Sequence, residues 1–162
     1  DFYIGKNKML EKGLDPTDFD DIRSVDVSEI VRLLIEFKSG NVDTFSVPTY
    51  CFRYSEPIGR RSIPVGDLCI LEGHMIFCDP DVRRLIDYLI YVEVPESVAK
   101  QRRLMRDVEE RGFSASNCSD YYRANVEPRL QEIINQKHVA DLILSNEMNL
   151  DLAPLIGRLG PA

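Results

Sequence analysis

Asp67-Leu68-Cys69-Ile70-Leu71-Glu72-Gly73 is the stretch that decides the predicted fold. Its apolar residues 68–71 end abruptly in an acid and a glycine. A continuous apolar run between turn residues is typical of a strand buried on both faces of a parallel sheet. Glu72 then lies at the carboxyl end of that strand, where open α/β sheets bind their ligands. The run predicts a buried strand with an acid at a binding edge, although a solvated strand-end residue would give the same pattern.

Strands and helices alternate along the rest of the chain. Apolar runs at 88–94 and 140–144 predict two more buried strands. Periodic apolar positions, caps and glycine stops predict the helices. The first begins after Asp26 or Ser28 and ends at Gly40, and the others lie at 81–87, 96–112, 119–136 and 150–159. A kink is predicted at Pro128 and a loop at 114–117. This alternation indicates an α/β fold, a parallel sheet with helices on both faces.

Residues 42–65 form a small β subregion in the prediction. Apolar and aromatic residues recur there, and the segment is interrupted by prolines and by Gly59. Proline cannot donate a ladder hydrogen bond, so it is confined to edge strands, strand starts and bulges. The pattern therefore predicts short antiparallel edge strands or a hairpin.

Composition limits the classes of protein that remain. The 162 residues suffice for one domain, predicted over 1–162, and the net charge of −7 argues against binding to nucleic acid or to an anionic membrane. No apolar run approaches the ~20 residues that span a bilayer. Four scattered cysteines show no metal-ligand spacing, which is usual for reduced thiols in the cytoplasm. A homo-oligomer is compatible with the sequence.

The helix predicted over 96–112 is rich in arginine. Arg103 and Arg106 lie three positions apart and so share a face, and Arg111 follows just before Gly112. Guanidinium groups on one face suit charge stabilisation during phosphoryl transfer. Ordinary surface ion pairs with acids four positions away would explain the same residues, and for a charged helix face alone this is the more common reading.

Several segments together resemble the uridine kinase family, in that family's order and close to its spacing. The Arg-Asp-x-x-x-Arg-Gly ending is the most specific of them. The segments are Asp1-Phe2-Tyr3, Val47-Pro48-Thr49-Tyr50, Ile70-Leu71-Glu72-Gly73, residues 102–112 and Lys137-His138-Val139-Ala140-Asp141. The resemblance implies a P-loop kinase fold of the nucleoside and nucleotide kinase type with a mobile lid, and phosphorylation of a uridine or cytidine 5′-hydroxyl by ATP.

The resemblance also implies roles for acidic residues. Asp1 matches the general base that accepts the proton of the ribose 5′-hydroxyl as this oxygen attacks the γ-phosphoryl group. Glu72 matches the acid that helps to hold Mg²⁺, through water as this ion commonly requires. His74 can line the same site, although a lone histidine is more often structural.

Aromatic and basic residues complete the implied site. Tyr3 and Tyr50 match aromatic residues of the nucleoside pocket. Arg103 and Arg106 match lid arginines that face the phosphates, and Arg111 matches a further arginine near the site. The implied small-molecule partners are ATP and a nucleoside.

The chain departs from the family pattern in several places. The Gly-x-x-x-x-Gly-Lys-Ser/Thr loop, expected before Asp1, does not occur in these 162 residues. Tyr54 and Ser55 stand where the family has a base-reading histidine, Phe113 replaces an arginine, and Tyr121 falls where glutamine is usual. Sibling kinases for pantothenate, nicotinamide riboside or a sugar phosphate therefore remain open. So does a degenerate kinase fold that acts as a non-catalytic binding or regulatory module.

Overall fold

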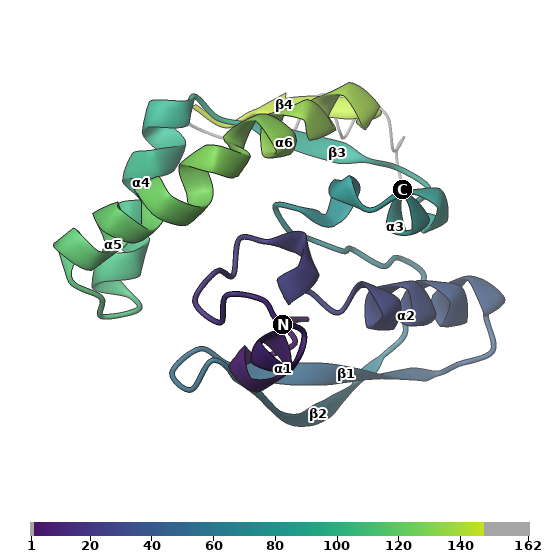
Figure 1. The fold of residues 1–162 in the computed structure, drawn as a ribbon. Coiled ribbons are helices and arrows are strands. Elements are labelled where there is room, and N and C mark those ends of the chain that lie inside the picture. Colours follow the sequence, from purple (N-terminus) through teal and green to yellow (C-terminus); the bar gives the residue numbers. More distant parts are fainter. Residues whose placement is uncertain (1, 148–162) are drawn as a thin grey trace. The chain divides into compact units, whose positions relative to one another are not determined.

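The computed structural model describes residues 2–147. The chain divides into two compact units, Asp1–Asp87 and Tyr88–Ala162 (Figure 1). A single domain over 1–162 stays a prediction. Asp1 and the helix predicted at 150–159 lie outside the described residues.

The first unit combines a helical part with a hairpin. Residues of its longest helix belong to both buried hydrophobic clusters of the unit. In chain order the elements are α1 (Lys6–Glu11), a 3₁₀ turn (Ile22–Ser24), α2 (Val27–Ser39), β1 (Thr44–Cys51), β2 (Glu56–Pro64), a second 3₁₀ turn (Ile76–Cys78) and α3 (Pro80–Leu85).

Helix α2 begins and ends where its sequence predicts. Asp26 is the N-cap, and its carboxylate accepts a hydrogen bond from the backbone N–H of Glu29 at 3.2 Å. Gly40 ends the helix in the left-handed conformation with φ 64°, which glycine adopts without steric cost. Ile30, Leu34 and the α3 residue Val82 are buried together on one side of α2.

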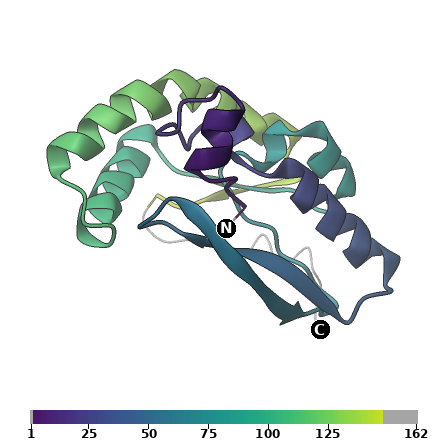
Figure 2. The ribbon, with the colours of Figure 1, turned by 60° about the horizontal axis from the view of Figure 1, so that its bottom comes forward.

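The hairpin packs on the other side of α2. Leu33 of the helix forms a buried cluster with Phe45 and Val47 of β1. Strands β1 and β2 pair antiparallel from Thr44↔Pro64 to Cys51↔Glu56, and Figure 2 shows their twisted ribbon. A register shift between Thr49 and Tyr50 forms a bulge in the ladder. The predicted hairpin over 42–65 is confirmed.

The strand predicted at 68–71 is wrong. Residues 65–73 form no strand, and the side chains of Leu68 and Ile70 are 74% and 81% exposed. Leu71 alone packs against the core of the unit. A buried parallel strand needs hydrogen-bonded neighbours on its edges. Within residues 2–147 the sheets are the β1–β2 pair and the β3–β4 pair, and neither includes this segment.

The second unit is a strand, a set of helices and a returning parallel strand. Strand β3 pairs with β4 from Ile90↔Leu142 to Glu93↔Ser145. This pair confirms the predicted parallel α/β pattern. The elements are β3 (Ile90–Glu93), α4 (Glu96–Glu109), α5 (Ala115–Tyr121), a π turn (Tyr122–Val126), a 3₁₀ turn (Glu127–Arg129), α6 (Leu130–Asn135), a 3₁₀ turn (Gln136–Val139) and β4 (Leu142–Ser145).

The predicted helix at 119–136 is longer and less regular than expected. Ser114 caps α5 by accepting a hydrogen bond from the Asn117 N–H at 3.2 Å, so the loop predicted at 114–117 is wrong. Pro128 lies in the 3₁₀ turn between the π turn and α6. Proline lacks the N–H that an α-helix interior requires, which explains the irregularity that the sequence predicts as a kink.

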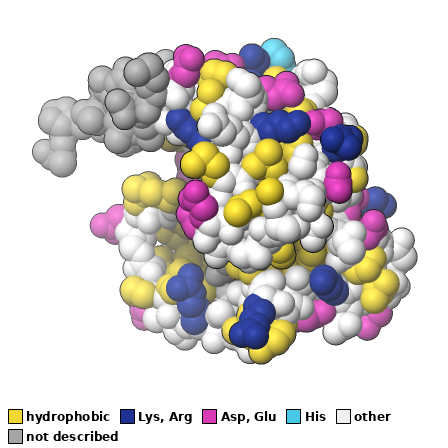
Figure 3. Space-filling view, turned by 90° about the vertical axis from the view of Figure 1, so that its left-hand side faces the viewer, with side chains coloured by type: hydrophobic (Ala, Val, Ile, Leu, Met, Phe, Trp, Pro, Cys, Tyr) yellow, Lys and Arg dark blue, Asp and Glu magenta, His cyan; other side chains and the backbone are white. Residues whose placement is uncertain are grey.

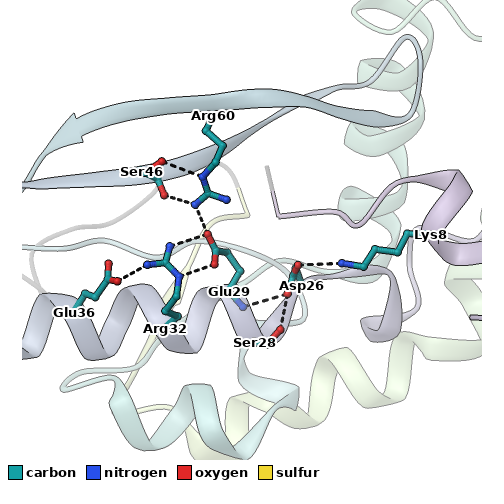
Figure 4. Close-up of polar contacts among 8 residues, drawn as sticks. All are labelled: Lys8, Asp26, Ser28, Glu29, Arg32, Glu36, Ser46 and Arg60. Atoms are coloured by element: carbon teal, nitrogen blue, oxygen red, sulfur yellow. Dashed lines mark hydrogen bonds and ion pairs between the residues drawn. The ribbon is translucent and has the colours of Figure 1, made fainter.

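A charged network joins α2 to the hairpin (Figure 4). Arg32 donates to both carboxylate oxygens of Glu29, at 2.7 and 2.8 Å, and also pairs with Glu36. Arg60 of β2 contacts the same Glu29 carboxylate and donates to the Ser46 hydroxyl at 2.9 Å. Hydrogen bonding from Arg32, aided by Arg60, lowers the pKa of Glu29 to about 2.

We expect Glu29→Gln to flatten the dependence of stability on acid pH. The folded-state pKa of Glu29 lies below its ordinary value of 4.5, so its contribution is complete above that value and is lost as the pH falls towards 2. Thermal unfolding followed by circular dichroism between pH 7 and pH 2 measures this. The matched control is Glu36→Gln, which should change the slope less than Glu29→Gln, because among the described residues the Glu36 carboxylate pairs with one arginine whereas that of Glu29 pairs with two. Equal slopes for wild type and Glu29→Gln would contradict the assignment.

None of the helices within residues 2–147 has the length and apolar character needed to cross a bilayer.

Candidate functional site

Aromatic side chains gather in the first unit. Tyr3 lies 5.4 Å from Tyr50 and 5.5 Å from Phe19 between ring centroids, and Tyr50 lies 5.2 Å from Phe52. Tyr3 is held in place by an isolated bridge to Val25. The interplanar angles of 51° to 88° are edge or tilted arrangements, which aromatic rings prefer. The structure thus brings together the two tyrosines that the family resemblance assigns to the nucleoside pocket.

Tyr50 has a buried polar group in this cluster. The residue is 8% exposed, and its hydroxyl is buried without a hydrogen-bond partner among the described residues. Burial raises the pKa of Tyr50 to about 12; the nearby Ser55 hydroxyl opposes the rise without reaching hydrogen-bond geometry. An unsatisfied buried hydroxyl costs roughly 1–3 kcal/mol. A ligand that bonds to this hydroxyl would recover part of that cost.

Tyr3 also lines a groove of about 360 Å³ in the first unit. Four charged side chains stand on its wall and pair with each other (Figure 4). Lys8 lies 3.7 Å from Asp26, and Arg60 contacts Glu29. The charged side chains on the groove wall are therefore paired with each other, and the aromatic residues Phe2 and Tyr3 also line the groove.

The acidic candidates differ in their surroundings. Glu72 is exposed and makes no hydrogen bond or ion pair within residues 2–147, so its carboxylate is accessible. Two residues further on, His74 Nε2 lies 3.2 Å from the Oδ1 atom of Asp20, which is only 2% exposed. The prediction for Asp1 concerns a residue that the structure does not describe.

Asp20 is the residue of this unit that sequence reasoning missed. Asp20 belongs to an acidic loop to which the sequence assigned no role. In the structure, Asp20 is buried, pairs with His74, and directly follows Phe19 of the aromatic cluster. An acid beside an aromatic residue in a short loop was the available signal, but nothing in the spacing distinguished it from Asp15 or Asp21.

The arginines of the second unit converge on one carboxylate. Asp107, on α4, lies 3.1 Å from Arg106 Nη2, 3.1 Å from Arg111 Nη1 and 3.7 Å from Arg103 Nε. Arg103 also lies over the ring of Tyr121, 5.8 Å from its centroid. The structure thus brings together all three predicted arginines, and Arg106 pairs with Asp107 rather than with Glu110.

Neither unit offers an all-protein metal cage in its described part. Across residues 2–147 no group of three His, Cys, Asp or Glu side chains is placed to hold a metal ion. Mg²⁺ commonly keeps several waters and takes one or two carboxylates together with substrate phosphates. A single accessible carboxylate such as Glu72 fits that mode of binding.

On the face drawn in Figure 3, Lys and Arg side chains are interspersed with Asp and Glu. They do not gather into one basic patch there.

Comparison with known proteins shows the family of the chain. Residues 6–153 match the model of the phosphoribulokinase / uridine kinase family. The chain belongs to this family. Its fold is accordingly that of the P-loop kinases, as the resemblance implied, with an α/β arrangement and parallel strands.

Individual relatives are kinases. The chain is 31% identical to uridine kinase of Clostridium novyi, over 93% of this chain and 74% of that protein. It is 33% identical to uridine kinase of Haemophilus influenzae, over 79% of this chain and 60% of that protein. It is 30% identical to uridine-cytidine kinase A of Dictyostelium discoideum, where the match covers 85% of this chain but 28% of the longer protein. These relatives are named as uridine or uridine-cytidine kinases, and the chain spans between 28% and 74% of their lengths.

Proposed function

We propose that the chain provides the acceptor pocket and the lid of an ATP-dependent kinase that phosphorylates the 5′-hydroxyl of uridine or cytidine. Membership of the family supports the kinase class. The observation that carries the nucleoside assignment is the buried, unpartnered Tyr50 hydroxyl within an aromatic cluster. Aromatic rings contact the flat faces of bases, and a hydroxyl among them can bond to a ring nitrogen or carbonyl.

The arginines would act on the phosphates. Arg103, Arg106 and Arg111 carry guanidinium groups that match phosphate oxygens in geometry and charge. Phosphoryl transfer depends almost entirely on positioning and on stabilising the charge of the equatorial oxygens. Helix α4 would then serve as the lid helix, and Asp1 would accept the proton from the attacking hydroxyl.

Magnesium would complete the site. Glu72 would hold Mg²⁺ through water, and the ion when bound would neutralise charge on the phosphates of ATP. The proposed cellular setting is pyrimidine salvage in the cytoplasm, which is compatible with the free thiols of Cys51, Cys69, Cys78 and Cys118.

Tyr50→Phe tests the acceptor pocket. We expect the KM for uridine to rise about 2- to 12-fold, the equivalent of one ordinary hydrogen bond of ~0.5–1.5 kcal/mol, while the melting temperature stays equal or rises. The gain in stability follows because phenylalanine removes a buried hydroxyl that has no protein partner. The assay is initial-rate kinetics with the product of the complete reading frame, with uridine, cytidine, pantothenate and nicotinamide riboside as acceptors.

Tyr88→Phe is the matched control. The Tyr88 hydroxyl is also buried without a partner among the described residues, but Tyr88 makes none of the ring contacts of the Tyr3–Tyr50 cluster. Its removal should leave the KM for every acceptor unchanged. An unchanged uridine KM in Tyr50→Phe, or preferred turnover of pantothenate, would refute the nucleoside assignment.

A further inference from the structure

Asp107 is an acid that is buried among cations. The residue is 7% exposed and lies in the last turn of α4. Its Oδ1 atom accepts hydrogen bonds from Arg106 Nη2 at 3.1 Å and Arg106 Nε at 3.3 Å, and the same oxygen lies 3.1 Å from Arg111 Nη1. Its Oδ2 atom lies 3.7 Å from Arg103 Nε. One carboxylate therefore contacts three guanidinium groups.

Three guanidinium groups share the single carboxylate of Asp107. A carboxylate offers about four acceptor positions, whereas three guanidinium groups carry roughly fifteen N–H donors, so Asp107 can orient them but cannot saturate them. Without it, the three cations would repel one another and their long side chains would have no shared anchor.

We propose that Asp107 is a positioning residue for phosphoryl transfer, because its carboxylate holds the guanidinium groups of Arg103, Arg106 and Arg111 in one convergent arrangement for the phosphates of ATP. This inference rests on the proposed function. The sequence pattern offered only a single i,i+4 ion pair between Arg103 and Asp107, which is worth little at an exposed surface. The structure adds the burial of Asp107 and the two further arginines.

The backbone around Asp107 adds a second connection. The Phe113 N–H donates to the Asp107 carbonyl at 3.1 Å, which folds the turn after α4 back onto the helix and brings Arg111 to the carboxylate. Arg103 is steadied from its other side by the ring of Tyr121. The Asp107 side chain thus contacts Arg103 and Arg106, which lie within α4, and Arg111, which lies just after it.

Asp107→Asn tests this role, since it keeps the shape and removes the charge. We expect kcat to fall about 10- to 100-fold, in line with small misplacements of catalytic groups, while the KM for ATP stays equal or falls because one negative charge has gone. Asp107→Glu restores the charge and should recover part of kcat. Asp120→Asn removes an acid of α5 that makes an exposed pair with Arg123 of the π turn, and it serves as the matched control with wild-type kinetics.

Two kinetic results would overturn the proposal. The first is an unchanged kcat in Asp107→Asn. The second is a loss of kcat that follows the loss of melting temperature and that Asp107→Glu does not relieve, because this would make Asp107 merely structural.

A measurement without turnover separates this inference from the proposed function. In ¹⁵N spectra of residues 1–162, the Nε–H signals of Arg103 and Arg106 should shift in Asp107→Asn and stay in place in Asp120→Asn. In a titration with inorganic triphosphate, the arginine signals of the wild-type protein should all shift with the same midpoint concentration. In Asp107→Asn, each arginine signal should shift with its own midpoint concentration. If the wild-type protein phosphorylates no acceptor, the proposed function fails, and these spectra still decide whether Asp107 holds the arginines. Unchanged arginine signals in Asp107→Asn would overturn the inference.

Discussion

We expect Arg103→Ala to lower kcat by about two to three orders of magnitude and to leave the fold intact. The magnitude is typical for the loss of one group that stabilises charge in the transition state. The contacts that the variant gives up include an ion pair at 3.7 Å with Asp107 and a contact with the Tyr121 ring, each worth about 1 kcal/mol or less at partly exposed positions. Single-turnover kinetics with the product of the complete reading frame, beside thermal unfolding, measure both effects.

The neighbouring arginine provides the control. Arg102 donates to the carbonyl oxygens of Asn146 and Glu147 at 2.9 and 2.8 Å, so it ties α4 to the segment after β4. Arg102→Ala should lower the melting temperature and leave kcat close to wild type. The opposite outcome, in which Arg103→Ala unfolds readily but keeps its kcat, would show that Arg103 is structural and that α4 is not the lid.

Asp1→Asn and Glu72→Gln should respond differently to magnesium. The first removes the proposed proton acceptor, and general-base catalysis typically contributes ~10²–10⁴-fold, so kcat should fall in that range with little change in nucleoside binding. The second weakens a proposed magnesium contact, so excess Mg²⁺ should restore part of the rate. Added Mg²⁺ should not help Asp1→Asn, because a missing proton acceptor is not a matter of metal occupancy.

A titration of initial rate against Mg²⁺ in both variants tests the two assignments. Asp43→Asn offers a control for the loss of an acid elsewhere in the first unit. Equal rescue of both variants, or rescue of Asp1→Asn alone, would mean that the roles of the two carboxylates are exchanged.

Local signals in the sequence predicted most of the elements. The two ends of α2, at Asp26 and Gly40, could be predicted because helix capping and left-handed termination depend only on neighbouring residues. The hairpin followed in the same way from its prolines and alternating residues. The strand predicted at 68–71 failed because its formation depends on partner strands, and an apolar run does not show whether these are present.

The site was predictable in part for a similar reason. Motif spacing identified Arg103, Arg106 and Arg111, which lie within one helix and the turn after it. From the sequence, Asp107 was predicted only as an ordinary i,i+4 ion-pair partner of Arg103. Its burial and the return of the chain at Phe113 are tertiary features, which spacing does not show. Asp20 and the orphan hydroxyl of Tyr50 depend likewise on contacts between segments far apart in the sequence.

The most direct test of the central claim follows radiolabel from [γ-³²P]ATP into uridine, with the product of the complete reading frame and Mg²⁺. The account predicts uridine 5′-monophosphate as the labelled product, formation that requires both Mg²⁺ and ATP, and loss of nearly all label transfer in Arg103→Ala. Absence of labelled nucleotide from uridine and from cytidine, with a folded protein that still binds a nucleoside, would contradict the account and favour a non-catalytic binding module.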